Sequence, residues 1–246
     1  GIQIIEDAAH ALGSTYKNGQ RVGSCCYSLM TVFSLHPVKA IAAGEGGVIT
    51  TNDESIYRKL LRLRSHGINK LDDNFQLRDE AFTGHLPNPW YYEMQELGFH
   101  YRITDIQSSL ALSQLNKLDK FIAKRKEIAS VYHNAISSIP NVSEAQPMPH
   151  AAGISAHHLY VIRVKFQDLG QSRASFQHDL RQMGIGSQVH YIPVPMHPYY
   201  RRLGHDTHSL PNALCYYSEC ISLPIYYTLQ PHEIERVIIS LKALLS

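Results

Sequence analysis

Short apolar runs alternate with turn-forming residues near the start of the chain. The runs cover residues 2–6, 29–34 and 46–51, and a Lys-Asn-Gly-Gln turn at residues 17–20 follows the first of them. Runs of this length between turn signals predict strands. The run that ends just before Asp7 predicts a strand buried on both faces.

Helical spacing of apolar residues follows in two segments. Residues 52–65 predict a helix that is capped by Asn52 or Asp53. Residues 104–136 begin with a capping box and predict one long helix. Between them, the polar and proline-containing residues 69–100 predict a long ordered loop, which is either a surface excursion packed by its aromatic side chains or a wall of a substrate or subunit pocket.

The last part of the chain changes pattern again. Residues 158–166 alternate as a strand, residues 172–183 predict a helix, and residues 231–245 carry one apolar helical face. This order predicts a compact α+β domain. We therefore expect two domains, at residues 1–137 and 138–246, with the long helix leading from the first to the second.

Composition narrows the class of protein. Of 246 residues, 44% are hydrophobic and 18% are charged, which favours a globular protein over a disordered one. The formal net charge of +2 is too small to indicate a nucleic-acid partner. No apolar run approaches the length that crosses a bilayer, so we expect no membrane insertion.

Cysteine and histidine spacing gives no sign of a disulfide framework or a metal site. The four cysteines form neither a CxxC motif nor a secreted-type pattern, which fits a reducing cytoplasm. His197, His205 and His208 are loosely spaced and lack a matching set of cysteines or carboxylates. We therefore expect no bound metal and a cytoplasmic location.

Lys39 is the strongest candidate for a catalytic residue. It ends the run TVFSLHPVK, thirty-two residues after Asp7 and five residues after Ser34. A pyridoxal phosphate enzyme needs an amine to form a Schiff base, an acid to keep the pyridine nitrogen protonated, and a donor for the phosphate. Lys39, Asp7 and Ser34 supply these groups in turn, although Asp7 alone could be a turn-capping acid and Ser34 an ordinary strand-end serine.

Five motifs in register strengthen this interpretation. They are EDAAHALG, FSLHPVK, GEGGVITT, LRSHGI and LGFHYRITDIQ. Together they resemble the DegT-type nucleotide-sugar aminotransferases of the aspartate aminotransferase fold, and the resemblance covers nearly the whole chain. It implies an α/β protein, in which the second half of a fold type I large domain precedes a small α+β domain. Family members carry a long segment before EDAAH, so we expect that segment to be missing here.

The resemblance also assigns cofactor-binding residues. It places Lys39 on pyridoxal 5'-phosphate, Asp7 at the pyridinium nitrogen, Ser34 at the phosphate and His10 beside the ring or Asp7. As an isolated histidine, His10 would equally suit a buried structural role. His100 stands where the family has an asparagine that reaches the phosphate in the partner subunit, so its role depends on whether an imidazole can replace an amide there.

Substrate-binding candidates come from two motifs. Arg102 in LGFHYR is a candidate anion ligand, with a salt bridge at a helix end as its structural alternative. His190 and Tyr191 begin a segment that resembles the substrate-side loop of the family and could contact sugar hydroxyls or diphosphate.

The implied function is amination of a nucleotide sugar by a homodimer with a shared active site. The PWYYEMQELGF segment and the HPVK form resemble members that aminate C4 of a UDP-linked 4-keto-6-deoxy-N-acetylhexosamine, with glutamate as the expected donor, on the way to pseudaminic acid. One alternative is a sugar dehydratase of the same fold, which has histidine where this chain has Lys39. The other is a truncated chain without catalytic activity.

Overall fold

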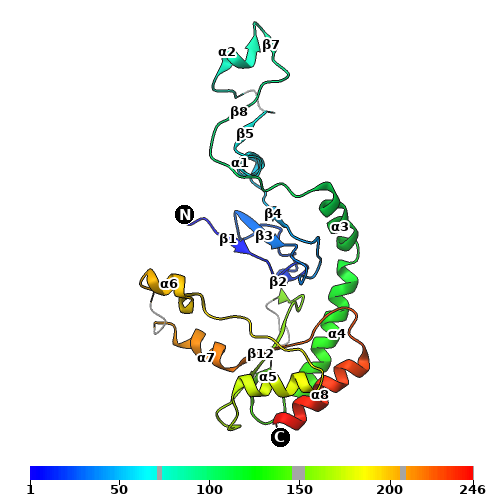
Figure 1. The fold of residues 1–246 in the computed structure, drawn as a ribbon. Coiled ribbons are helices and arrows are strands. Elements are labelled where there is room, and N and C mark those ends of the chain that lie inside the picture. The colour runs from blue at the N-terminus through cyan, green and yellow to red at the C-terminus, as the bar shows by residue number, and fades with distance from the viewer. Residues whose placement is uncertain (71–73, 146–152, 206–208, 246) are drawn as a thin grey trace. The chain divides into compact units, whose positions relative to one another are not determined.

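The computed structural model describes residues 1–70, 74–145, 153–205 and 209–245 (Figure 1). These residues form two compact units. Of these described residues, those within 1–12 and 21–116 make up the first unit, and those within 13–20 and 117–245 make up the second. The expected division of the chain at residue 137 stays a prediction.

A three-stranded sheet organises the first unit. Its strand order is β1 (Ile5–Asp7), β3 (Met30–Ser34) and β4 (Gly47–Thr50), so the three predicted strands are confirmed with shorter ends. β1 runs parallel to β3, whereas β4 is antiparallel to β3. The prediction that β1 is buried on both faces is wrong, because Ile5 is 60% exposed in the described structure.

The first predicted helix is confirmed as α1 (Glu54–Leu63). Its cap is Asp53, whose carboxylate accepts hydrogen bonds from the backbone N–H groups of Ser55 and Ile56. These bonds satisfy two of the donors that a helix leaves free at its first turn.

The segment after α1 contains more regular structure than the predicted loop. It holds β5 (Ile68–Asn69) paired with β8 (Glu93–Met94), the short helix α2 (Arg78–Ala81), and the hairpin of β6 (Phe82–Thr83) and β7 (Leu86–Pro87). Such two-residue strands carry too little periodicity to be recognised in a sequence.

Glu93 fixes this segment through four hydrogen bonds. Its carboxylate accepts from the backbone of Gln76 and Leu77, from the Gln95 amide and from the Tyr91 hydroxyl, at 2.5 to 3.2 Å. Desolvation raises the pKa of the carboxyl, but these donors outweigh it and lower the pKa to about 2. The carboxylate is therefore charged at neutral pH and holds residues 76–77 against residues 91–95.

The long helix predicted from Thr104 is wrong as one element. The capping box is confirmed, because the hydroxyl of Thr104 accepts from the Gln107 N–H and the Gln107 side chain accepts from the Thr104 N–H. However, α3 (Asp105–Leu115) ends at Asn116, and a separate helix, α4 (Leu118–Ile136), follows in the second unit. Apolar residues keep helical spacing across the break, so periodicity did not reveal it.

The second unit is built on an antiparallel sheet with the order β12, β11, β9. The strands are β12 (Cys220–Leu223), β11 (Tyr160–Val164) and β9 (Val142–Ala145), and a small pair joins β2 (Thr15–Tyr16) to β10 (Gly153–Ile154). The helices predicted at residues 172–183 and 231–245 are confirmed as α5 (Arg173–Gln182) and α8 (Pro231–Leu245). Not predicted were η1 (Val194–Met196), α6 (Pro198–Arg202), α7 (Pro211–Glu219) and β12.

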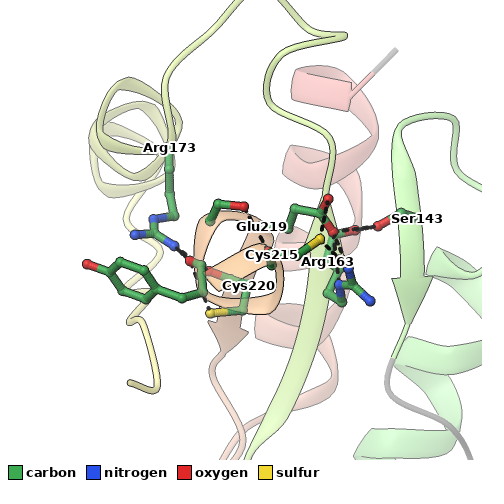
Figure 2. Close-up of polar contacts among 8 residues, drawn as sticks. Ser143, Arg163, Arg173, Cys215, Glu219 and Cys220 are labelled. Atoms are coloured by element: carbon green, nitrogen blue, oxygen red, sulfur yellow. Dashed lines mark hydrogen bonds and ion pairs between the residues drawn. The ribbon is translucent and has the colours of Figure 1, made fainter. Parts of the chain in front are cut away.

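Polar contacts attach α7 to its neighbours (Figure 2). Arg163 on β11 donates from Nε and Nη2 to one carboxylate oxygen of Glu219, at 2.9 and 2.7 Å. On the other side, Arg173 on α5 donates to the carbonyl of Tyr217 and lies over the Tyr217 ring. Two arginines from different elements thus fix the end of α7 just before β12 begins.

The main hydrophobic core lies in the second unit, where α4, α5 and α8 pack with the sheet. Tyr132, Tyr160, Phe176 and Leu241 are fully buried members of it. Burying one large apolar side chain contributes on the order of 1.5 to 3 kcal/mol, so this cluster supplies most of the stability of the unit.

Arg125 is a buried cation within this unit. One guanidinium nitrogen, Nη1, donates to the carbonyls of His157, His158 and Ile225 at 2.9 to 3.2 Å. Burial lowers the pKa of Arg125, and the carbonyl dipoles compensate its desolvation. The side chain thereby joins α4 to the segments before β11 and after β12.

His157, beside Arg125, is buried as a neutral ring. It is 1% exposed, and neither ring nitrogen has a hydrogen-bond partner in the described part of the chain. Burial, and then the charge of Lys126, lower the pKa of His157. Because the folded state disfavours the protonated ring, His157 leaves stability intact above its ordinary pKa of about 6.5 and reduces it as the pH falls below that value.

We predict that His157→Phe raises the free energy of unfolding by about 1 to 3 kcal/mol, because it removes two unpaired buried polar atoms. The variant should also lose part of the decline in stability between about pH 6.5 and pH 5. Chemical denaturation followed across this pH range measures both effects. The exposed His85→Gln is the control, and equal pH profiles for wild type and His157→Phe would contradict the prediction.

Candidate active site

Parallel pairing of β1 with β3 brings the candidate acid and the candidate lysine to one edge of the sheet. Asp7 ends β1 opposite Val32, and Ser34 ends β3 two residues further on. Lys39 follows in the turn after β3. The carboxyl ends of parallel strands are where ligands bind in open α/β sheets, so this edge is the candidate cofactor site.

Backbone hydrogen bonds shape the turn that carries Lys39. The Leu35 N–H donates to the Gly46 carbonyl at 2.9 Å, and the Ala43 N–H donates to the Leu35 carbonyl at 3.0 Å. The Lys39 N–H donates to the His36 carbonyl at 2.9 Å. The turn is therefore closed at its base and its lysine is held at a defined position.

The environment of Lys39 favours a reactive amine. The side chain is half-buried, and desolvation lowers its pKa, while the negative charge of Asp7 raises the pKa by a smaller amount. A lysine with a lowered pKa has a larger neutral fraction at neutral pH, and only the neutral amine acts as a nucleophile or base. The Asp7 carboxylate and the Lys39 amine thus lie within electrostatic range of each other.

Asp7 and Ser34 end β1 and β3, and His10 lies in the turn after β1. One oxygen of Asp7 accepts from the Ala9 N–H at 3.0 Å, so Asp7 does cap the turn after β1. The Ser34 hydroxyl accepts from the His36 N–H at 3.3 Å. His10 is half-buried in the turn three residues after Asp7. Their roles toward a cofactor stay predictions.

Two glycines of the GEGG motif, Gly46 and Gly47, lie where a side chain would crowd neighbouring atoms. Gly46 has φ +144°, and a Cβ there would lie 3.1 Å from the Ile103 side chain. A Cβ on Gly47 would lie 3.0 Å from the carbonyl oxygen of Phe33. These glycines therefore allow β4 to begin close against β3.

His100 and Arg102 lie on an exposed stretch of the first unit. Backbone hydrogen bonds join this stretch to the LRSHGI motif, from the His66 N–H to Phe99 at 3.0 Å and from the Tyr101 N–H to Arg64 at 2.9 Å. The ring of His100 meets the ring of His66 edge-on at 5.5 Å between centroids. Two motifs far apart in the sequence are thus one structural element.

Two glycines make this pairing possible. Gly67 has φ +70°, and a Cβ there would lie 1.7 Å from the Glu96 carbonyl oxygen. A Cβ on Gly98 would lie 2.3 Å from the Gly67 nitrogen. Sequence reasoning missed the contact, although a glycine in each motif was its available signal.

His190 and Tyr191 belong to the second unit. The segment before them pairs with β12, because Gln188 and Ser222 exchange backbone hydrogen bonds at 2.8 and 3.2 Å. Nδ1 of His190 lies 2.7 Å from the Ser222 hydroxyl, and its ring meets that of Tyr191 at 4.5 Å between centroids. The Tyr191 side chain is 58% exposed. The substrate roles of both residues stay predictions.

No group of three or more potential metal ligands occurs within the described ranges, and His208 lies outside them. Within the same ranges, every helix is too short or too polar to cross a membrane. All four cysteines are free thiols.

Solved aminotransferase structures share this fold. Helicobacter pylori PseC, an aminotransferase involved in the biosynthesis of pseudoaminic acid, is 30% identical, with a TM-score of 0.85 over 99% of this chain and 60% of that chain. The PLP form of a Streptococcus pneumoniae protein described as a sugar aminotransferase is 30% identical, with a TM-score of 0.83 over 99% of this chain and 57% of that chain. The fold is therefore that of the fold type I pyridoxal phosphate transferases, and the expected fold class is confirmed.

Sequence similarity defines the family. The DegT/DnrJ/EryC1/StrS aminotransferase family matches residues 1–242. The spore coat polysaccharide biosynthesis protein SpsC of Bacillus subtilis is 36% identical over 241 residues, which are 97% of this chain and 58% of SpsC. The chain belongs to the DegT/DnrJ/EryC1/StrS aminotransferase family. It spans 57 to 60% of the length of these relatives.

We predict that Gly67→Ala disrupts the contact between the LRSHGI and LGFHYR motifs. The control is Gly84→Ala, which has a similar positive φ of 60° but open space around the added Cβ. Gly84→Ala should cost about 1 to 2 kcal/mol of backbone strain, and Gly67→Ala about 1 to 3 kcal/mol more from steric overlap. Chemical denaturation and hydrogen exchange at the His66 and Tyr101 amides measure the difference. Equal losses in the two variants would contradict the structure at this contact.

Proposed function

We propose that this chain carries the lysine-bearing part of a pyridoxal phosphate-dependent sugar aminotransferase. The observation that supports this most is Lys39, a half-buried lysine whose pKa is lowered by burial, at the same sheet edge as the carboxylate of Asp7. Membership in an aminotransferase family supports the interpretation of Lys39 and Asp7 as residues that bind pyridoxal phosphate.

Lys39 and Asp7 suit pyridoxal phosphate in charge and position. When bound, the cofactor would supply two groups: an aldehyde, which takes up an amino group, and a ring, which accepts electrons. Lys39 would hold the cofactor through its amine and, as a base, would carry a proton at the reacting carbon atoms. Asp7 would keep the ring nitrogen protonated, since a carboxylate next to that nitrogen raises its pKa.

The remaining site residues take the roles of anion and substrate ligands. Ser34, His10 and, from the partner subunit of a homodimer, the residue at the His100 position contact the cofactor. Arg102, His190 and Tyr191 contact the nucleotide-sugar substrate. A hydroxyl, an imidazole and a guanidinium are all suitable donors to phosphate oxygens.

The relatives support the proposed class of sugar substrate. SpsC takes part in spore coat polysaccharide biosynthesis, and PseC takes part in the biosynthesis of pseudoaminic acid. We propose amination at C4 of a UDP-linked 4-keto-6-deoxy-N-acetylhexosamine in pseudaminic acid or related surface-sugar biosynthesis, with glutamate as donor, in the cytoplasm. Lys39 disfavours the dehydratase alternative, because that class has histidine at this position.

Exposed apolar residues support a need for further protein around the first unit. α3 has no buried residue, and Tyr101 is 74% and Ile106 84% exposed. An apolar helix in water is stable only when something covers it. A partner subunit or the additional length present in relatives would do so, which also keeps open the alternative that this chain alone is not catalytic.

We predict that borohydride reduction in the presence of excess pyridoxal phosphate attaches the cofactor to Lys39. Peptide mapping by mass spectrometry identifies the labelled residue. Lys39→Ala should abolish the label, while Lys59→Ala, which removes an exposed lysine of α1, should leave it unchanged. Specific labelling at another lysine would refute the assignment.

We also predict that the 246-residue chain alone binds pyridoxal phosphate weakly and turns over little keto sugar, because α3 buries no residue and the sheet that ends at Asp7 and Ser34 has three strands in the described part of the chain. An absorbance titration with pyridoxal phosphate measures the affinity. Tight saturable binding with turnover would show instead that the chain is sufficient.

A further inference from the structure

A cavity of about 270 Å³ opens on the second unit, and none of the proposed site residues lines it. It lies where α5 ends and α8 begins, and the segment after β12 forms its third side. Ile185, Leu229 and Val237 form an apolar floor, and each is at most 3% exposed. Such a floor excludes water and favours an apolar group.

Two opposite charges and a hydroxyl line the rim of this cavity. They are the guanidinium of Arg236, the carboxylate of Glu233 and the phenol of Tyr226. Burial and the charge of Glu233 raise the pKa of Tyr226, while Arg236 opposes them, so the three groups lie within electrostatic range of one another. The rim therefore offers both a cation and an anion to a ligand.

Arg236 is available for a ligand. Within the described ranges its guanidinium makes no hydrogen bond and no ion pair, although Glu233 lies only one helical turn away. Glu233 instead accepts a hydrogen bond from the Gln230 N–H at 2.7 Å, which fixes its carboxylate at the start of α8. Both charged residues lie on α8, and Glu233 is bonded to the Gln230 backbone and not to Arg236.

Backbone geometry keeps the cavity open on the α5 side. Gly184 ends α5 with φ +76°, and a Cβ there would lie 3.7 Å from the Arg236 guanidinium. A Cβ on Gly186 would meet nothing within 4 Å. Two residues without side chains therefore border the space beside Arg236.

We propose that this cavity is a binding site for a free α-amino acid with an apolar side chain. Its carboxylate pairs with Arg236, its ammonium group with Glu233, and its side chain packs on Ile185, Leu229 and Val237. A doubly acidic amino acid such as glutamate fits poorly, because its second carboxylate would lie on the apolar floor. The site is separate from the proposed transamination chemistry, and its test needs no cofactor.

Titration of the isotopically labelled chain with L-phenylalanine, followed by two-dimensional NMR, tests the site. We expect saturable shifts at the amides of Ile185, Gly186 and Leu229. Phenethylamine lacks the carboxylate, N-acetylphenylalanine lacks the ammonium group, and L-glutamate lacks the apolar side chain, so all three should bind more weakly. If phenethylamine or N-acetylphenylalanine bound as tightly as L-phenylalanine, the assignment of an amino acid as the ligand would be overturned.

Variants separate the cavity from non-specific association. Arg236→Gln removes a charged donor and should weaken L-phenylalanine binding roughly tenfold to a hundredfold. Gly186→Leu should abolish binding by filling the cavity. The exposed Arg181→Gln on α5 is the matched control and should bind as the wild type does. Absence of saturable shifts, or unchanged affinity in Arg236→Gln with a native spectrum, would overturn the proposal.

Discussion

The parallel pairing of β1 with β3 is the constraint on which the candidate active site depends. It sets Asp7 opposite Val32 and therefore brings the end of one strand beside the turn that leaves the other. Without this register, a carboxylate and a lysine separated by thirty-two positions in the sequence would have no reason to interact. The lowered pKa of Lys39 results from its burial in the turn, and the opposing influence of Asp7 results from the pairing.

The two units differ in how completely they bury their apolar residues. The second unit has a continuous core that includes Tyr132 and Leu241, and buried arginine contacts complete it. The first unit has a largely exposed strand, β1, and a helix, α3, that has no fully buried residue. The better packed unit carries the candidate substrate residues His190 and Tyr191. The candidate catalytic residue Lys39 lies in the unit that buries fewer of its apolar residues.

Local signals in the sequence predicted local structure well. The cap at Asp53 and the capping box at Thr104 each involve neighbouring residues, and both form as expected. The strands around Lys39 were also predictable, because short apolar runs and glycine punctuation mark them. Their position within a cofactor site came from resemblance of motifs and not from periodicity.

Other features depend on contacts that no local pattern records. The break at Asn116 keeps apolar spacing on both sides, so one long helix looked equally consistent. The burial of β12 depends on its pairing with β11, and the proximity of Gly67 to Gly98 depends on a chain reversal between them. The hydrogen bonds of Arg125 to three carbonyls have a further consequence. Peptide carbonyls do not titrate, so these hydrogen bonds keep their strength at acidic pH, where carboxylates become protonated. Added salt should also weaken them little, because they do not include an ion pair that salt could screen.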